Sequence, residues 1–263
     1  MDQLRTHSLP INLLRESFFG PWVPIPGKKG RVRHHHMSLA HWFECQKFMP
    51  ARPDLRDSIL CCPSVKEARK FSKARQQHWR SDWNLIRHLV LTSGLGFLTL
   101  DRPDLGLNKE MSVELLDSLL ETKLPPRFLE QCIDRYKVWL DGPHIGTYGA
   151  NTAPEGVVGR KMAKTVQAKP SWTLVSLCNK NASWRLHDWA LAQHVPIQYI
   201  GTEVSRLTNS LIEQLVQEST QMVVFEVKGG KGSDSVIARS RATKTPVSLE
   251  LYRPEDLDTS SLI

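Results

Sequence analysis

A regular alternation of strand-like and helix-like segments in the second half of the chain constrains the fold most. From residue 137 onward, short apolar runs typical of buried strands alternate with longer amphipathic segments. This alternation predicts a parallel sheet whose strands are joined by right-handed crossover helices. The predicted strands are residues 137–140, 172–177, 197–200, 222–227 and 247–251, and the predicted helices are 154–167, 181–194, 203–218 and 233–243.

The sequence pattern of the first half predicts mostly helices. Prolines and glycines between residues 21 and 30 break any regular element, so residues 1–36 are expected to be irregular. Helices are predicted at 38–47, 64–77, 83–93, 112–121 and 127–136, with Ser38, Ser64 and Asp82 as N-caps. We therefore predict an α/β protein with a mostly helical domain at 1–120, a connecting helix at 121–136 and a parallel-sheet domain at 137–263.

Composition narrows the class of protein. Of the 263 residues, 40% are hydrophobic and 24% charged, which suits globular domains and not a disordered chain. No apolar run reaches the roughly 18 residues of a membrane span, and the first residues lack the apolar stretch of a secretory signal. The five cysteines are an odd number without disulfide or zinc spacing. We expect reduced thiols, a cytoplasmic location and no membrane partner.

The net charge of +8 is unevenly distributed. Residues 28–87 contain 14 Lys and Arg against 5 Asp and Glu, whereas residues 141–263 contain 13 against 12. A concentrated positive charge attracts polyanions, either nucleic acid or the pyrophosphate of a dinucleotide. A solvated basic helix face is the alternative interpretation.

Two predicted strand ends carry glycine-rich turns, where ligands bind in open parallel sheets. Asp141 and Gly142 follow the first predicted strand, and the turn from Lys228 to Asp234 follows the fourth. Glycines let the backbone approach an oxygen ligand, and the following helix directs free N–H groups at the same place. A plain tight turn is the alternative. The second turn predicts phosphate binding by Gly229, Gly230, Lys231, Gly232, Ser233 and Asp234.

At these residues the second half resembles the SLOG superfamily of Rossmann-like proteins, which includes the YspA, DprA and LOG groups. Its G-x-x-G-[ST] pattern is matched within Gly229–Asp234, and its upstream Arg-x-x-Asn by Arg206 and Asn209. The first family motif falls at residues 176–183, beginning with Ser176, and has lost its glycines and its acid. The resemblance implies nucleotide binding, and the degraded motif argues against catalysis by this domain more than against binding.

A second group of residues lies in the predicted helix 38–47. His41, Trp42, Phe43, Glu44 and Lys47 combine acidic, basic and aromatic side chains within two turns. Such a cluster is suited to lining a pocket for a base and its phosphates, and a simple amphipathic core helix is the alternative. The aromatic pair Phe18 and Phe19 is a second candidate platform on which a base stacks, and packing in the core is the alternative interpretation.

Together with Glu67, Ala68, Arg80, Asp82 and Trp83, this helix is similar to the NADAR family over residues 18–104. The resemblance implies an N-glycosidase acting on ribosylated substrates, including ADP-ribose attached to guanine and early intermediates of riboflavin synthesis. It implies a substrate site at the matched residues His41, Phe43, Lys47, Arg80, Asp82 and Trp83, of which we assign Asp82 to catalysis. From the residues alone we add the aromatic side chains of Trp42 and Phe19 to the substrate-binding residues and Glu44 to the catalytic ones.

Two departures from the family pattern matter. The glutamate that precedes the family histidine is Ala40 here, and no Trp-Gly-rich closure follows Leu105. Cleavage of an N-glycosidic bond creates an oxocarbenium-like centre, which a carboxylate stabilises. Glu44 lies one helical turn from position 40, so we expect it to replace the missing acid.

The sequence therefore predicts a protein that handles ADP-ribose-like or NAD-derived nucleotides, with hydrolysis of an N-glycosidic bond as the reaction. A sensor or sequestering protein without turnover and a nucleic-acid-binding module at 28–87 are the alternatives. The expected partners are a small nucleotide or an ADP-ribosylated nucleic acid, and a homo-oligomer is compatible with the sequence. No cofactor and no metal are expected, since the run His34–His36 has no cysteine at ligand spacing.

Overall fold

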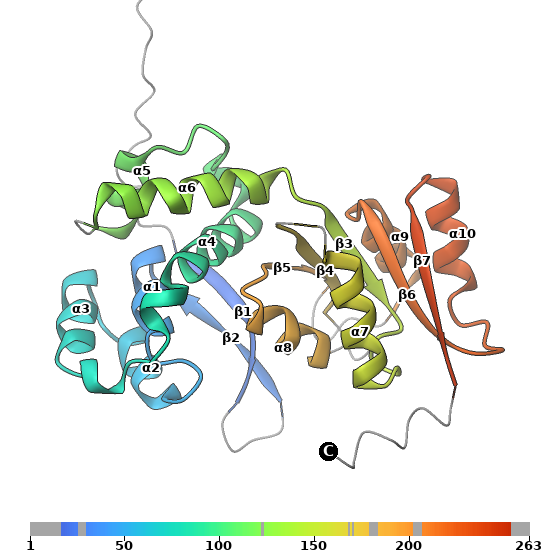
Figure 1. Ribbon diagram of the computed structural model, residues 1–263, viewed down its shortest axis with the longest axis horizontal. Helices are drawn as coiled ribbons and strands as arrows, with labels where there is room; N and C mark the ends of the chain where they lie inside the picture. Colours follow the sequence, from blue (N-terminus) through green and yellow to red (C-terminus); the bar gives the residue numbers. More distant parts are fainter. Residues whose placement is uncertain are drawn as a thin grey trace, which may run out of the picture. The chain divides into compact units, whose positions relative to one another are not determined.

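The computed structural model describes residues 17–25, 30–121, 124–167, 169, 171–178, 184–201 and 207–253. Contacts between Cα atoms divide the chain into two compact units, Met1–Lys137 and Val138–Ile263 (Figure 1). The first unit is mostly helical and the second contains a parallel sheet, so the predicted α/β class is confirmed.

The second unit is built on a five-stranded parallel sheet with the order β5-β4-β3-β6-β7. From β3 the chain moves outward through β4 to β5 and then returns to the other side of β3 to form β6 and β7. The strand order therefore reverses between β3 and β6, which makes this pair the topological switch point of the sheet. The strands are β3 His144–Tyr148, β4 Thr173–Leu177, β5 Ile197–Ile200, β6 Gln221–Val227 and β7 Val247–Tyr252.

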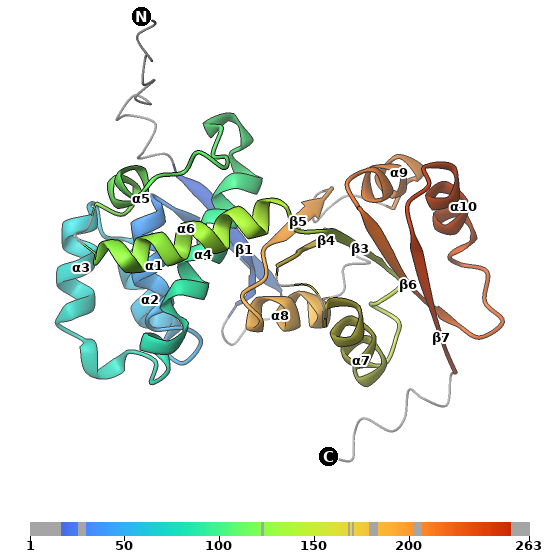
Figure 2. The same cartoon turned by 45° about the horizontal axis from the view of Figure 1, so that its top comes forward.

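Four helices cover the two faces of this sheet, with α7 and α8 on one face and α9 and α10 on the other (Figure 2). A core cluster joins β4, β6 and the inner sides of α9 and α10, and includes Val175, Leu215 and Val224, each fully buried. β4 is buried along its whole length, as expected for a strand covered on both faces. The helices are α7 Glu155–Val166, α8 Trp184–Ala192, α9 Asn209–Gln217 and α10 Asp234–Ala242.

The first predicted strand, at 137–140, is wrong. Those residues form the last turn of α6 (Pro126–Leu140), and the first strand of the sheet is β3, inside the segment predicted to be a glycine-rich turn. Gly146 lies within this strand, and a Cβ there would come within 2.1 Å of the hydroxyl of Ser219 and 2.3 Å of the sulfur of Met222. The glycine therefore permits the close approach of these side chains to the strand and does not mark a turn.

The first unit contains the helices α1 Leu39–Gln46, α2 Pro53–Leu60, α3 Val65–Lys73, α4 Trp83–Asp101 and α5 Val113–Leu120, and most of α6. Two of the predicted N-caps are confirmed, because the hydroxyls of Ser38 and Ser64 accept hydrogen bonds from the amides of His41 and Glu67. The third is confirmed in position only. Asp82 is the N-cap residue of α4, but its carboxylate makes no capping hydrogen bond and instead accepts hydrogen bonds from Arg80 at 2.6 and 2.9 Å.

Helix α4 extends eight residues beyond its predicted end at residue 93. Gly94, which reads as a helix breaker, lies in its interior, where a Cβ would come within 2.5 Å of the Trp42 ring. The packing of the indole against the helix backbone therefore requires the glycine and offsets its poor helix propensity.

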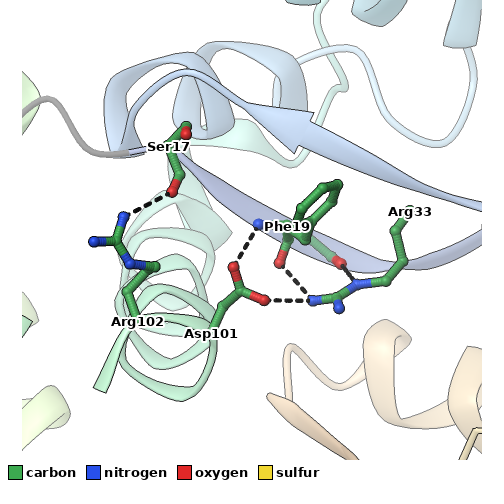
Figure 3. Close-up of polar contacts among 6 residues, drawn as sticks. Ser17, Phe19, Arg33, Asp101 and Arg102 are labelled. Carbon is green, nitrogen blue, oxygen red and sulfur yellow. Dashed lines mark hydrogen bonds and ion pairs between the residues drawn. The ribbon is translucent and has the colours of Figure 1, made fainter. Parts of the chain in front are cut away.

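Residues 18–36 are not irregular, as predicted, because they contain an antiparallel hairpin of β1 Phe18–Pro24 and β2 Arg31–His36. Asp101, at the end of α4, anchors it: its carboxylate accepts hydrogen bonds from the amide of Phe19 at 2.9 Å and from Arg33 at 3.0 Å (Figure 3). Arg33 also donates to the carbonyls of Phe19 and Gly20.

None of the described helices has the length and apolar character needed to cross a membrane.

Candidate functional site

The first unit contains a pocket of about 280 Å³ between α1, α3 and the end of α5. Three predicted site residues line it: Phe43 and Glu44 on α1, and Lys47 at the C-cap of that helix. On the α3 side, Arg69 and Lys73 are four residues apart and face the same space. Among the described residues, the lining consists of Ala40, Phe43, Glu44, Lys47, Arg69, Lys73, Gln76, Trp79, Leu120 and Leu124.

The centre of this pocket is a nearly buried ion pair. Lys47 Nζ lies 2.6 Å from Glu44 Oε2, and the two side chains are 11% and 5% exposed. The ammonium also lies 4.4 Å from the centroid of the Trp79 ring, a cation–π contact. Burial lowers the pKa of Lys47, and the neighbouring Glu44 carboxylate opposes that change.

The charge of the pocket favours an anion. Among the described lining residues, Lys47, Arg69 and Lys73 contribute three positive charges and Glu44 is the one carboxylate. Arg69 is held in place because its guanidinium donates hydrogen bonds to the carbonyls of Leu120 and Glu121 at the end of α5. A ligand with phosphate groups and an aromatic base therefore fits both the cations and the aromatic walls.

Ala40 and Glu44 line the same pocket. Position 40 is where the NADAR pattern has its glutamate, and the alanine leaves that space without a carboxylate. Glu44, one turn further along α1, supplies a carboxylate to the same cavity, as the helical spacing predicted.

Several residues predicted for this site lie elsewhere. His41 contacts the Ser38 hydroxyl at 2.9 Å and the Cys62 carbonyl at 3.2 Å, and burial lowers its pKa. Trp42 packs in the core against Phe18 and Phe97. These two side chains support the helix and do not line the pocket.

Arg80, Asp82, Trp83 and Phe19 are also outside the pocket lining. Arg80 and Asp82 form an ion pair with each other, so the position of Asp82 does not support a catalytic role. Trp83 is buried behind Phe43, with their ring centroids 4.9 Å apart. Phe19 is on the hairpin and 45% exposed.

The second unit contains a pocket of about 370 Å³ at the carboxyl ends of β3, β4 and β6. This is the switch point of the sheet, where open parallel sheets bind ligands. Four residues predicted to bind a nucleotide line it: Ser176, Gly230, Gly232 and Ser233. The other lining residues are Thr147, Tyr148, Gly149, Ala150, Asn151, Thr152, Leu177, Leu207, Phe225, Glu226, Val227 and Tyr252.

The carboxylate of Glu226 occupies the glycine turn of this second pocket. Its Oε1 accepts a hydrogen bond from the Ser233 amide at 3.2 Å, and its Oε2 accepts one from the Ser233 hydroxyl. A Cβ on Gly230 would lie 3.2 Å from the same Oε1. The internal carboxylate therefore takes the donors that the sequence assigned to a phosphate at the start of α10.

Gly149 brings the loop after β3 close to β6. Its φ of +76° lies in the left-handed region, and a Cβ there would come within 2.1 Å of the Phe225 carbonyl oxygen. The glycine therefore fixes the wall of the pocket between the two strands that flank the switch point.

Ser176 is paired with a residue that sequence reasoning missed. Its hydroxyl lies 2.9 Å from His187 Nε2 on α8, and both residues are buried. The His187 ring is held edge-on by Trp184 and Tyr199. The pairing links β4 to α8, and no local sequence spacing signals it.

The remaining predicted nucleotide-binding residues are not in the pocket lining. Asp141 and Gly142 precede β3 and lie at the amino ends of the strands, because the strand predicted before them is helical. Asn209 is the exposed first residue of α9. Arg206 lies outside the described residues. Gly229, Lys231 and Asp234 are exposed around the turn.

The structure adds Arg69, Lys73, Gln76 and Glu226 to the candidate site residues. The i, i+4 spacing of Arg69 and Lys73 on a predicted helix was a usable signal for the first two. Glu226 was not identifiable, since its role depends on the side chain folding back into the turn that follows it.

Within the described part of the chain, no group of three or more His, Cys, Asp or Glu residues is placed to hold a metal ion. His35 lies on the opposite face of β2 from its neighbours His34 and His36, so the histidine run does not converge on one point. The NADAR and SLOG resemblances rest on the motifs quoted above. The chain matches no protein-family model, and no curated protein is significantly similar to it.

Proposed function

We propose that this protein binds an ADP-ribose-like or NAD-derived nucleotide in the pocket of the first unit and hydrolyses its N-glycosidic bond with the help of Glu44. One observation carries the proposal: a nearly buried carboxylate, three cations and aromatic walls line a single cavity. The cations suit the phosphates, the rings suit the base, and the carboxylate suits the sugar between them.

The proposed reaction adds water across the bond between C1′ of the ribose and the base nitrogen. The electrons of the breaking bond move to the base, and positive charge develops at C1′ and the ring oxygen. The Glu44 carboxylate stabilises this charge and accepts a proton from the attacking water. From ADP-ribosylated guanine the departing nitrogen takes up a proton, whereas nicotinamide leaves NAD as a neutral base and the proton from water passes through Glu44 to solvent. The products are the free base and a ribose with a hydroxyl at C1′.

Lys47 is proposed to position Glu44 and to contact the phosphates. Its ion pair with Glu44 offsets part of the cost of burying that side chain, since a lone buried charge is costly. Arg69 and Lys73 face the pocket from α3 and supply the remaining positive charge.

The test is incubation of the protein with NAD or with an oligonucleotide carrying ADP-ribosylated guanine, followed by chromatography of the products. Free base and the released ribosyl product are expected. Glu44→Gln should lower the rate by roughly a hundredfold or more, which is typical for loss of a general base. Glu130→Gln, at an exposed glutamate on α6 outside the pocket lining, is the matched control and should retain the rate.

The second candidate function is nucleotide binding without turnover. It is favoured by the Glu44–Lys47 ion pair, since Lys47 competes for the carboxylate that the reaction needs, and by the degraded first motif of the second unit. Recovery of bound ligand unchanged, with no base released by the wild-type protein, would reject the hydrolase and support this alternative.

A further inference from the structure

We propose that the protein forms a symmetric dimer in which the outer edge of β7 pairs antiparallel with the same strand of a second copy. The pairing joins the five-stranded sheets of the two copies into one continuous sheet. This inference concerns the second unit and is independent of the proposed hydrolysis, whose pocket lies in the first unit.

The outer edge of β7 offers backbone hydrogen-bonding groups. β7 ends the strand order, so within the described part of the chain it is paired with β6 alone. The carbonyls of Pro246 and Tyr252 accept hydrogen bonds from amides of the β6 segment at 2.8 and 2.7 Å, which shows that the even-numbered positions face β6. Peptide groups alternate in direction along a strand, so the amides and carbonyls of Val247, Leu249 and Leu251 face outward. Such an edge is a template for another strand.

The side chains at these outward positions are apolar. Leu249 and Leu251 are 42% and 53% exposed, and Val247 packs against the core cluster between the sheet and the helices α9 and α10. All three side chains project to the same face of the sheet, because they occupy alternate positions of the strand. A second strand beside β7 would cover both exposed leucines, which favours association.

β7 lacks the residues that usually keep edge strands apart. Lysine and proline are common blockers of strand pairing, and neither occurs between Val247 and Tyr252. The one charged residue of the strand is Glu250, and its carboxylate lies 3.0 Å from the ammonium of Lys161 on α7. This ion pair offsets the negative charge that would otherwise repel a second copy.

The strand is complementary to itself about Leu249. In an antiparallel pair centred there, Leu249 lies opposite the partner's Leu249, and Val247 lies opposite the partner's Leu251. The outward-facing residues of the two strands then exchange backbone hydrogen bonds, and their apolar side chains meet on one face of the joined sheet. Ser248 lies opposite the partner's Glu250, so the two glutamates are not directly opposed. The two-fold axis closes the contact at two copies.

The charge of the second unit also suits a second copy of the chain. Residues 138–263 contain 13 basic and 12 acidic residues, so two copies of this unit repel each other little. A strand of six residues is about 20 Å long, which places the interface at the small end of specific interfaces. We therefore expect a dissociation constant of roughly micromolar size.

The experiment is sedimentation-velocity centrifugation of the full chain at concentrations below and above this value. The wild type should pass from one to two chain masses as its concentration rises. Leu249→Lys should weaken the dimer about tenfold or more, because two ammonium groups would oppose each other at the two-fold axis. The matched control is Leu85→Lys, at a leucine of α4 that is 75% exposed, and it should leave the dimer unchanged.

A mixture of two variants tests the register. Leu249→Glu alone should also weaken the dimer, and an equimolar mixture with Leu249→Lys should restore it, because opposite charges then face each other across the axis. Restoration also shows that both variants are folded. The proposal is overturned by a wild type that stays monomeric or grows beyond two copies, by a Leu249→Lys variant that dimerises like the wild type, or by a mixture that stays monomeric. NAD turnover by Leu249→Lys should be unchanged, which keeps this result separate from the fate of the hydrolase.

Discussion

Each of the two pockets is lined by a glutamate, and the two carboxylates lead to different expectations. Glu44 is paired with a cation and faces a cavity that contains further cations. Glu226 is bonded to neutral donors, the amide and hydroxyl of Ser233, and occupies the place of an anion. The first arrangement supports an anionic ligand beside a reactive carboxylate, and the second opposes a phosphate until the carboxylate moves.

The substitution Glu226→Gln should therefore improve nucleotide binding in the second unit. Removing the negative charge ends its repulsion of a phosphate, and affinity for ADP should rise roughly tenfold, in line with the ~1.5 kcal/mol or more of a charge-assisted hydrogen bond. Isothermal titration calorimetry measures the change, with the exposed Glu213→Gln as control. Equal affinities for the wild type and Glu226→Gln would show that the turn does not receive phosphate.

His36 should make the first unit sensitive to acid. Burial lowers the pKa of His36 to about 3, and the pKa values of His34 and His41 are lowered for the same reason. In the unfolded chain His36 takes up a proton as the pH falls below its ordinary pKa of 6.5. In the folded protein His36 stays neutral until the pH approaches 3. Stability is thus fully present above pH 6.5 and is lost as the pH falls below it.

For His36 alone this loss is about 2 kcal/mol between pH 7 and 5. Urea unfolding at the two pH values measures the free energy of unfolding. The variant His36→Gln should reduce the pH dependence, and an unchanged slope in that variant would contradict the assignment.

At the scale of elements, the sequence was informative where side-chain periodicity decides the structure. The strand predicted at 197–200 is confirmed as β5, and those at 172–177, 222–227 and 247–251 are confirmed within one residue at each end. The strand predicted at 137–140 failed because a short apolar run at a helix end cannot be distinguished from a buried strand by pattern alone.

Glycine and proline caused the other errors. Gly146 lies within β3 and Gly94 within α4 because neighbouring side chains occupy the space of a Cβ. The hairpin at 18–36 was not predicted, because its prolines and glycines are typical of segments without regular secondary structure. Such packing is a tertiary property, and one sequence does not reveal it.

The candidate site was predicted in part. Glu44, Phe43 and Lys47 line a common pocket, because helical spacing fixes their relation. Arg80 and Asp82 do not join them, since they are adjacent enough in the chain to pair with each other. The other wall of the pocket comes from α3 and the end of α5, and its position depends on the folded unit.

Two glycines of the second unit test whether atoms in the space of a Cβ are what require glycine at a position. Gly149→Ala should destabilise the protein by about 2 kcal/mol or more, because its positive φ and the nearby Phe225 carbonyl exclude a methyl group. Gly159→Ala, within α7, has no heavy atom within 4 Å of the added Cβ and should stabilise by ~0.5–1 kcal/mol. Denaturant unfolding compares them, and similar effects from both changes would refute the account of Gly149.

On the scale of the whole chain, charge is divided unequally between the units. Residues 138–263 carry 13 basic and 12 acidic residues, which leaves 22 basic and 15 acidic in residues 1–137, from the totals of 35 and 27. The first unit therefore holds +7 of the net +8, and it also contains the cationic pocket. Binding of anions is expected to depend mainly on that unit.

The most direct test of the central claim is a crystal structure of Glu44→Gln grown with NAD, a variant in which slow turnover preserves the ligand. We predict density for the nucleotide in the pocket of α1 and α3, with the phosphates near Lys47, Arg69 or Lys73 and C1′ beside residue 44. Density confined to the pocket beside Glu226, with the first pocket empty, would contradict the proposed function.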